Sequence, residues 1–458
     1  MLSFMRQPRG FYRRIAYLAL PVVLQNLITT SLGFMDTFMV GLLGDAEMSA
    51  VTVANTPIFI MQLIVFGLQS GSSVLISQYW GKGDREAINR VLGIGFFAAG
   101  SVSVLFALVL ALRPAFVLGI ITDNAALVAI AEPYIRIVGL SYVFNSLASV
   151  YIGMQRSIEN PGFGMAVFAA STLVNTLGNY ILIFGKLGLP ALGVLGAAIA
   201  TLAARMLEFG AAAIYALRCR TVPLLPRCLL RPGGETLRSF IRYSTPVLLN
   251  ETLWGLGTSM FTVIMGHMAI STEILAAYTV AGNMDKLVTA ANFGVAAATS
   301  VVIGKEIGMG NRETVLDVGK ALTALALGVG IGVGLLEQAL FWTVLRPFVL
   351  PLFHLTGTAE TICTMLVCCL SAASPINSLM ITLITGVLRG GGDVRASMRI
   401  DLVPLWGATI PLLALCGLVL DAPLLAVCIV MTGESVLKVP FGLRRLASGR
   451  WIHDVTVS

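Results

Sequence analysis

The polar residues of one apolar stretch, 20–41, are of the types that bind and release a small cation. Gln25 and Asp36 are eleven residues apart, or three helical turns, so they lie on nearly one face of a helix, with Thr29 beside them. A carboxylate inside hydrocarbon costs several kcal/mol unless it faces a cavity or a partner. We therefore expect Asp36 to face a wet interior.

A weaker copy of this stretch occurs over 245–266 and contains a second acid, Glu251. At about 1.5 Å per residue, Glu251 lies about 18 Å from the cytoplasmic start of its helix, and Asp285 about 20 Å from the outer start of the next. Lys286 lies at the same depth. One hypothesis is a charged cluster of Glu251, Asp285 and Lys286 that attracts cationic solutes. The alternative is a self-neutralised structural pair of Glu251 with Lys286.

The elements that must position these residues are membrane-spanning helices. Hydrophobic residues make up 57% of the chain and charged residues 12%, where a soluble domain has about a quarter charged. Apolar runs of about twenty residues or more recur from end to end, so we expect an all-α integral membrane protein. The first run is too long for a signal peptide and should stay in the membrane. The seven cysteines have no metal-site spacing and are expected to be free packing thiols.

The apolar runs predict twelve spans in two bundles of six. We expect a basic leader 1–13, a first bundle 14–217, a cytoplasmic linker 218–236 rich in Pro and Gly, a second bundle 237–446 and a tail 447–458. The spans are expected at about 14–41, 48–78, 88–112, 127–153, 163–184, 190–217, 238–266, 272–303, 314–346, 358–387, 397–419 and 422–446.

The second half of the chain repeats the first. Phe66-Gly67 and Arg85-Glu86 recur as Phe293-Gly294 and Arg312-Glu313 at one constant offset. Because six spans are an even number, both halves enter the membrane in the same direction and are related by an axis along the membrane normal. Two such bundles in a V-shaped arrangement leave a central cleft, and rocking between them gives alternating access. This organisation points to a transporter.

The positive charge of +7 needs no nucleic-acid partner, because the basic residues gather in alternate short loops. This distribution predicts that both termini are cytoplasmic. We expect the protein to lie in an inner membrane. The loops expected to be cytoplasmic carry Arg6, Arg9, Arg13, Arg14, Lys82, Arg85, Arg90, Arg218, Arg220, Arg227, Arg231, Lys305, Arg312, Arg389, Arg395, Arg399, Arg444, Arg445 and Arg450.

Several motifs, taken in order along the chain, resemble the multidrug and toxic compound extrusion (MATE) family over nearly the whole length. They include Met35-Asp36-Thr37, Gly81-Lys82-Gly83-Asp84, Asn175-x3-Asn179-Tyr180, Gly196-Ala197-Ala198 and Gly386-Val387-Leu388-Arg389. The resemblance implies antiport, in which an organic and often cationic solute leaves while Na+ or H+ enters.

Members of the DinF-like branch place their cation or proton site in the first bundle, and the resemblance maps it onto Asp36, Asn175, Asn179 and Thr201. The chain departs from that pattern at Asn179, where an amide replaces a second carboxylate. One carboxylate with neutral oxygens suits either Na+ or a single proton. NorM-like members instead pair an acid of span seven with one of span ten. Here Glu251 is near the first position, but span ten has no carboxylate.

Depth along the helices supports the same set without the family. Asp36, Asn175, Asn179 and Thr201 come from three spans of one bundle and fall at a similar level. The structural alternatives are hydrogen bonds between helices for Asn175 and Asn179, and a buried acceptor for Asp36. The residues expected to line the substrate cleft are Gln25, Asn26, Asn250, Glu251, Trp254, Tyr278 and Asp285.

These features predict a monomeric multidrug efflux antiporter, coupled to H+ or Na+, with drug-like solutes and membrane lipids as its partners and no cofactor. The alternative is a lipid-linked oligosaccharide flippase of the same superfamily. An anionic lipid headgroup would call for several basic residues in the cleft, and the spans offer few. The chain has no nucleotide loop, metal triad or nucleophile–base set, so an enzyme is not expected.

Overall fold

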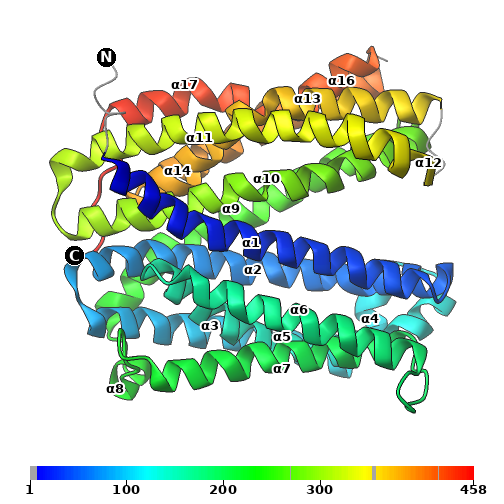
Figure 1. Ribbon diagram of the computed structural model, residues 1–458, viewed down its shortest axis with the longest axis horizontal. Coiled ribbons are helices and arrows are strands. Elements are labelled where there is room, and N and C mark those ends of the chain that lie inside the picture. The colour runs from blue at the N-terminus through cyan, green and yellow to red at the C-terminus, as the bar shows by residue number, and fades with distance from the viewer. Residues whose placement is uncertain (1–7, 269, 353–356, 421, 458) are drawn as a thin grey trace. The chain divides into compact units, whose positions relative to one another are not determined.

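The computed structural model describes residues 8–268, 270–352, 357–420 and 422–457, which fold into helices joined by short connections (Figure 1). Residues 1–7 of the predicted leader and Ser458 of the tail lie outside the described residues. The all-α prediction is confirmed. The first half comprises α1 (Arg9–Gly41), α2 (Asp45–Lys82), α3 (Arg85–Leu112), α4 (Pro114–Gly119), α5 (Ala125–Ser157), α6 (Pro161–Phe184), α7 (Val194–Arg218) and α8 (Pro226–Leu230).

The second half begins with α9 (Gly234–Gly266) and contains several π-helical segments, labelled η. The remaining elements are α10 (Ser271–Gly308), α11 (Arg312–Leu340), η2 (Phe341–Val349), α12 (Leu350–Leu352), α13 (Thr358–Ile381), η3 (Thr382–Leu388), α14 (Val394–Pro404), η4 (Leu405–Thr409), α15 (Ile410–Ala414), η5 (Leu415–Val419), α16 (Leu424–Thr432) and α17 (Glu434–Ala447). The short helices and the π-helical segments were not predicted from the sequence.

Within the described ranges, 11 helical segments are long and apolar enough to cross a bilayer. They coincide with eleven of the twelve predicted spans. The predicted seventh span is α9, which is 33 residues long but is not among the eleven. Its first half carries Glu235, Arg238 and Arg242, and these charges make that half polar.

Local signals in the sequence set several helix ends. The motif at 81–84 ends α2 and begins α3. Gly83 has a positive φ of 73°, which favours glycine, and the Asp84 side chain caps α3 by accepting from the Ala87 N–H at 2.9 Å. Asn124 caps α5 in the same way. Helix α1 begins at Arg9 rather than at 14, so the end of the predicted leader is helical.

The described chain divides into two compact units whose boundaries lie inside helices. Unit 1 comprises Met1–Val23 and Leu249–Val457, and unit 2 comprises Leu24–Leu248. These boundaries differ from the predicted division at the linker 218–236. They fall two residues after the helical prolines Pro21 and Pro246. The first part of α1 therefore belongs with the second half of the chain, and the first part of α9 with the first half.

The repeated Phe-Gly motif explains this exchange. In unit 2, a Cβ added at Gly67 of α2 would lie 2.8 Å from the Leu248 Cα of α9. In unit 1, a Cβ added at Gly294 of α10 would lie 2.3 Å from a methyl group of Val23 on α1. Each repeat thus uses an equivalent glycine to bring a helix of the other half into close contact, which no larger residue would allow.

Replacement of Gly71 by Ala is expected to destabilise unit 2. A Cβ there would lie 2.5 Å from the Ser244 Cα, so the α9 backbone must move. Overpacking of this kind costs about 1–3 kcal/mol, although Gly→Ala inside a helix is otherwise stabilising. The melting temperature of the detergent-solubilised protein tests this. Gly210→Ala in α7 is the control, because nothing lies within 4 Å of a Cβ at that position. Equal melting temperatures for the two variants would contradict the close contact.

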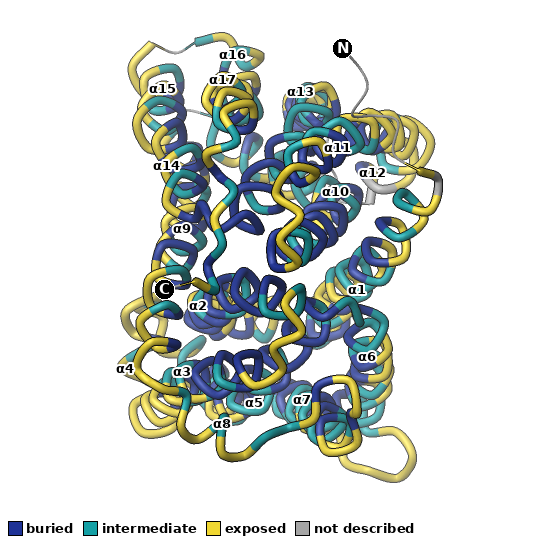
Figure 2. Tube along the Cα trace, turned by 90° about the vertical axis from the view of Figure 1, so that its left-hand side faces the viewer, coloured by how far each residue is buried: buried dark blue, intermediate teal, exposed yellow. Residues whose placement is uncertain are grey.

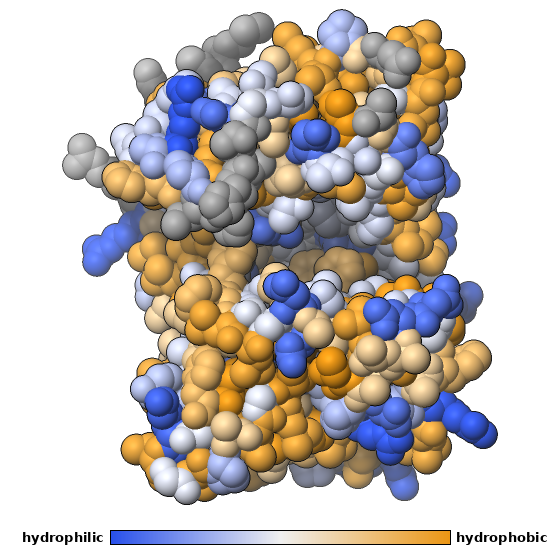
Figure 3. All heavy atoms as spheres, turned by 90° about the vertical axis from the view of Figure 1, so that its right-hand side faces the viewer, coloured by the Kyte–Doolittle hydropathy of each residue, from blue (hydrophilic) through white to orange (hydrophobic). Residues whose placement is uncertain are grey.

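Within each unit the buried residues lie along the sides of the helices that face one another, as Figure 2 shows. Hydrophobic side chains also cover much of the face that Figure 3 shows. Phe97, Leu105 and Leu217 are 80%, 65% and 81% exposed. Large apolar side chains on the outer faces of long helices fit contact with lipid.

Candidate functional site

The structure brings four predicted site residues of unit 2 into one chain of hydrogen bonds. Asn179 of α6 donates through Nδ2 to Asp36 Oδ1 of α1 at 2.5 Å and to Asn175 Oδ1 at 3.1 Å. Asn175 donates through Nδ2 to Thr201 Oγ1 of α7 at 3.3 Å. Asp36 is therefore connected through amides to two neighbouring helices.

Close packing of α6 on α7 positions this chain. Asn175 and Asn179 are four residues apart, so both side chains leave the same face of α6, and both are buried. A Cβ added at Gly178 would lie 2.9 Å from the Ala200 Cβ, and one at Gly196 would lie 2.6 Å from the Leu182 carbonyl carbon. Because the two backbones approach this closely, the short side chain of Thr201 reaches Asn175.

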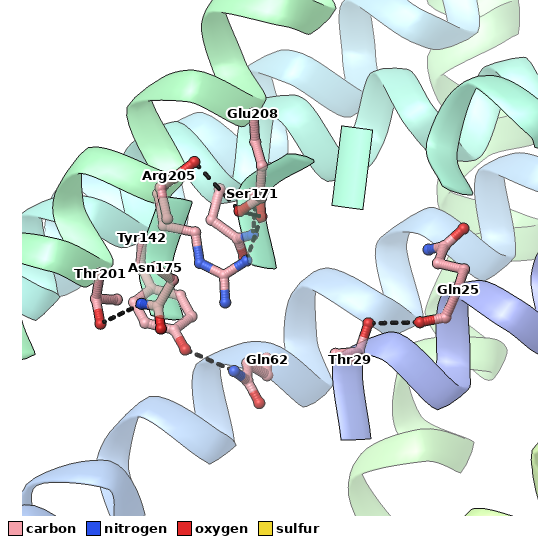
Figure 4. Close-up of polar contacts among 11 residues, drawn as sticks. Gln25, Thr29, Gln62, Tyr142, Ser171, Asn175, Thr201, Arg205 and Glu208 are labelled. Atoms are coloured by element: carbon pink, nitrogen blue, oxygen red, sulfur yellow. Dashed lines mark hydrogen bonds and ion pairs between the residues drawn. The ribbon is translucent and has the colours of Figure 1, made fainter. Parts of the chain in front are cut away.

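An ion pair of α7 forms the next layer of the site. Arg205 Nη1 lies 2.6 Å from Glu208 Oε1, as the spacing of three residues predicts. Glu208 also accepts hydrogen bonds from Ser171 of α6 at 2.6 Å and Asn145 of α5 at 3.1 Å. Figure 4 shows Arg205, Glu208 and Ser171 together, with Asn175 and Thr201 nearby. The Arg205 charge also attracts Asp36 electrostatically.

Two tyrosines of α5 complete the surroundings of Asp36. Tyr142 accepts a hydrogen bond from Gln62 of α2 at 2.6 Å (Figure 4), and Tyr134 donates to Asn55 at 3.5 Å. Both tyrosines lie within the range of the Asp36 charge. The sequence analysis did not select these tyrosines. Their only signal was a polar atom in an apolar run, which many tyrosines share.

One oxygen beside Asp36 remains available for a ligand. Asn179 Oδ1 is buried and has no hydrogen-bond partner among the described residues. A buried acceptor without a partner is costly, and a cation or a proton at Asp36 would supply the missing positive group. The described residues contain no group of three or more His, Cys, Asp or Glu side chains suited to a metal. A cation here would therefore be held by one carboxylate and neutral oxygens.

The other polar residues of the α1 stripe lie apart from this chain. Thr29 donates to the backbone oxygen of Gln25 at 2.8 Å, as Figure 4 shows. The Gln25 amide faces α6, where a Cβ added at Gly164 would lie 3.1 Å from its oxygen. Gln25 and Asn26 are both half-buried, and their place in a substrate cleft stays a prediction.

The charged cluster expected in the second half takes a different form in unit 1. Glu251 pairs with Arg389, with 2.5 Å between Oε1 and Nη1, rather than with Lys286. Both side chains are largely buried, at 12% and 4% exposed. The sequence analysis counted Arg389 among the charges of the cytoplasmic loops, but in the structure it is buried in this ion pair. Glu251 and Arg389 are 138 residues apart in the chain, so helical spacing could not predict their contact.

A second polar chain in unit 1 was missed. Asn250 donates to Asp401 of α14 at 2.9 Å, and Lys438 of α17 contacts Asp401 at 2.6 Å and also pairs with Glu434. Of these contacts, only the pair of Glu434 with Lys438, four residues apart on one helix, follows from local spacing. Asp401 is an acid within a predicted span, which was the available signal. Asn250 is buried in this chain rather than lying free in a cleft.

The remaining predicted cleft residues lie on α9 and α10. Asp285 is half-buried and interacts electrostatically with the exposed Lys286. Tyr278 packs against a hydrophobic core cluster of unit 1, and Trp254 is 37% exposed. A role in binding substrate stays a prediction for all three.

Comparison with known proteins gives the chain a family. The MatE family model matches residues 21–181 and 246–415, which include Asp36, Asn175 and Asn179. A curated protein of Thermotoga maritima named "Probable multidrug resistance protein NorM" is 24% identical over 441 residues, covering 96% of this chain and 93% of its own.

Solved structures share the fold. A crystal structure of MATE in complex with MaL6 has a TM-score of 0.85 at 19% identity, and 98% of this chain and 99% of that chain are covered. An outward-facing multidrug resistance MATE family transporter of the MOP superfamily has a TM-score of 0.84 at 18% identity, with 98% of each chain covered. Since the family model matches well over half of the residues, in both halves of the repeat, the chain belongs to the MatE family.

Proposed function

We propose that this protein is a secondary active multidrug efflux antiporter, which exports organic cations in exchange for H+ or Na+ by alternating access. The observation that carries the proposal is the chain from Asp36 through Asn179 and Asn175 to Thr201, with Asn179 Oδ1 left unpartnered beside the carboxylate. Family membership and the name of the Thermotoga relative support export of drug-like compounds.

In the proposed cycle Asp36 takes up the ion from the outer side. The ion neutralises the carboxylate, which changes the packing of α1 beyond Pro21 and releases the solute. A new solute, bound from the cytoplasmic side, then displaces the ion. Because Asn179 touches both Asp36 and Asn175, a change of charge at Asp36 alters the contact between α1 and α6.

Pairing of the basic side chains favours organic cations over an anionic lipid-linked oligosaccharide. Arg136 pairs with Glu132 at 2.6 Å, and Arg205 with Glu208 at 2.6 Å. A paired guanidinium offers little net positive charge to an anionic headgroup. Flippase activity therefore remains the second candidate and is an outcome of the test below.

We place the protein in the inner membrane as a monomer with cytoplasmic termini. Both ends of the described chain belong to unit 1 and lie at the same end of its long helices in Figure 1. That arrangement fits the positive charges at the two ends of the chain.

Ethidium efflux from proteoliposomes, under separately imposed proton and sodium gradients, tests the proposal. We expect one gradient to drive export and the other to have no effect, which identifies the coupling ion. An export rate that neither gradient changes would contradict antiport. Translocation of a fluorescent lipid-linked oligosaccharide without ethidium export would establish the flippase instead.

A further inference from the structure

Among the described acids of unit 1, Glu337 of α11 is fully buried with both carboxylate oxygens unpartnered, and the sequence analysis did not select it. Ionised, such a group would lack both water and a counter-charge, at a cost of several kcal/mol. Protonated, it is neutral and needs at most one acceptor for its hydrogen.

Close packing of α11 on α13 places hydroxyl groups beside this acid. A Cβ added at Gly334, one turn before Glu337, would lie 2.4 Å from the Ser371 backbone oxygen and 3.5 Å from the Ser374 Cβ. Ser374 Oγ is buried and also has no partner within the described ranges. The next residue of α11, Gln338, already donates to Ser371 at 2.6 Å. Ser374 is thus an unpartnered polar group against the same face of α11.

A second acid, Asp285 of α10, lies at the same level as Glu337. Asp285 lies 23 residues before the end of α10 at Gly308, and Glu337 lies 25 residues after the start of α11 at Arg312. At 1.5 Å per residue both acids are about 35–38 Å from the short connection that joins the two helices, so they share a level. Asp285 is also the charged group whose electrostatic repulsion acts on Glu337.

None of the described cations on the packed elements forms an ion pair with Glu337. In α17, Lys438 binds Asp401 and Glu434. In η2, Arg346 pairs with Glu360 of α13 at 3.1 Å. The cysteines of α13 at 363, 368 and 369 are free thiols, and Lys286 of α10 is exposed beside Asp285. Full burial without a described partner for either oxygen favours a protonated Glu337 over an ionised carboxylate.

We propose that Glu337 is a proton-binding group of the second bundle, protonated in this conformation and exchanging its proton during transport. The exchange step rests on the proposed antiport. The protonated state does not, because it can be measured without transport.

Infrared spectroscopy of the full-length protein in detergent at neutral pH tests the protonated state. A protonated carboxyl group gives a carbonyl stretching band that a carboxylate lacks. We expect this band to lose the intensity of one group in Glu337→Gln and to keep it in Glu313→Gln, whose side chain is exposed at the start of α11. An unchanged band in Glu337→Gln shows an ionised Glu337, solvated or holding Na+, and overturns the proposal.

Glu337→Met keeps the test decisive if the Gln variant does not fold. Replacing a neutral, unpartnered carboxyl group by an apolar side chain of similar length is nearly neutral or stabilising, so the melting temperature should be retained or raised. Loss of folding in the Met variant would show an ionised, paired carboxylate and overturn the proposal.

Proton release on ethidium binding, followed by a pH indicator in weak buffer, tests the exchange. Wild type should release more protons per ethidium bound than Glu337→Gln. Equal release from the two proteins would make Glu337 a static neutral group and overturn the exchange. If wild type exports no ethidium, the proposed function fails while the infrared result still decides the protonated state.

Discussion

Asp36→Asn is expected to reduce gradient-driven ethidium export to the leak rate of protein-free vesicles. An amide is neutral throughout the cycle, so it can neither take up nor release a positive charge. The fold should persist, because an Asn at this position still offers an oxygen to the Asn179 Nδ2 donor that now lies 2.5 Å from Asp36. Efflux from proteoliposomes, under whichever gradient drives the wild type, provides the measurement.

Two variants make this result specific. Asp123→Asn removes an exposed carboxylate from the connection before α5 and should export at the wild-type rate. The double variant Asp36→Asn/Asn179→Asp moves the carboxylate across one hydrogen bond, from α1 to α6. It should regain part of the coupled export if the site needs a carboxylate at this place. Wild-type export by the single Asp36→Asn variant would show that the coupling site lies elsewhere.

The motif resemblance selected Asp36, Asn175, Asn179 and Thr201, and depth along the helices predicted that they lie at a similar level. Asn175 and Asn179 share a face through their spacing of four residues, and their level in the bundle follows from the helix rise. The contact with Thr201 needs two close backbone approaches, at Gly178 and Gly196, which spacing alone does not reveal. The motif resemblance selected Thr201, and the packing explains it.

The second-bundle charges could not be paired from the sequence. Glu251 and Arg389 meet only through the tertiary structure of unit 1, and depth along the helices placed Lys286 at the level of Glu251. Glu337 is one acid in an apolar run, as Glu132 is. Glu337 has no partner in the described structure, whereas Glu132 forms an ion pair with Arg136, four residues further along the same helix. That difference depends on neighbouring helices.

The same limit applies to the division of the chain. The Pro- and Gly-rich connection 218–236 is the natural boundary by composition, yet the compact units divide after Pro21 and Pro246. The repeat analysis identified Gly67 and Gly294 as equivalent. Which helix packs against each glycine depends on the tertiary structure, and that packing determines which segments form a unit.

Glu251→Gln should lower both membrane abundance and melting temperature, because it leaves the largely buried Arg389 guanidinium without its carboxylate. Removing one partner of a buried ion pair costs roughly 3–5 kcal/mol, whereas an exposed pair contributes about 1 kcal/mol or less. Glu86→Gln is the matched control, since Glu86 pairs with Arg90 at 3.3 Å with side chains 65% and 42% exposed.

A second substitution separates a structural role from a transport role. In Glu251→Gln/Arg389→Gln neither buried charge remains, so much of the lost stability should return, although the Ser397 contact of Arg389 at 3.4 Å is also removed. Thermal unfolding in detergent measures the recovery, and ethidium efflux is assayed in parallel. Normal abundance and melting temperature in Glu251→Gln, together with lost export, would assign Glu251 to the substrate cleft instead. Lost abundance that the double variant restores would make the pair a clamp between α9 and η3.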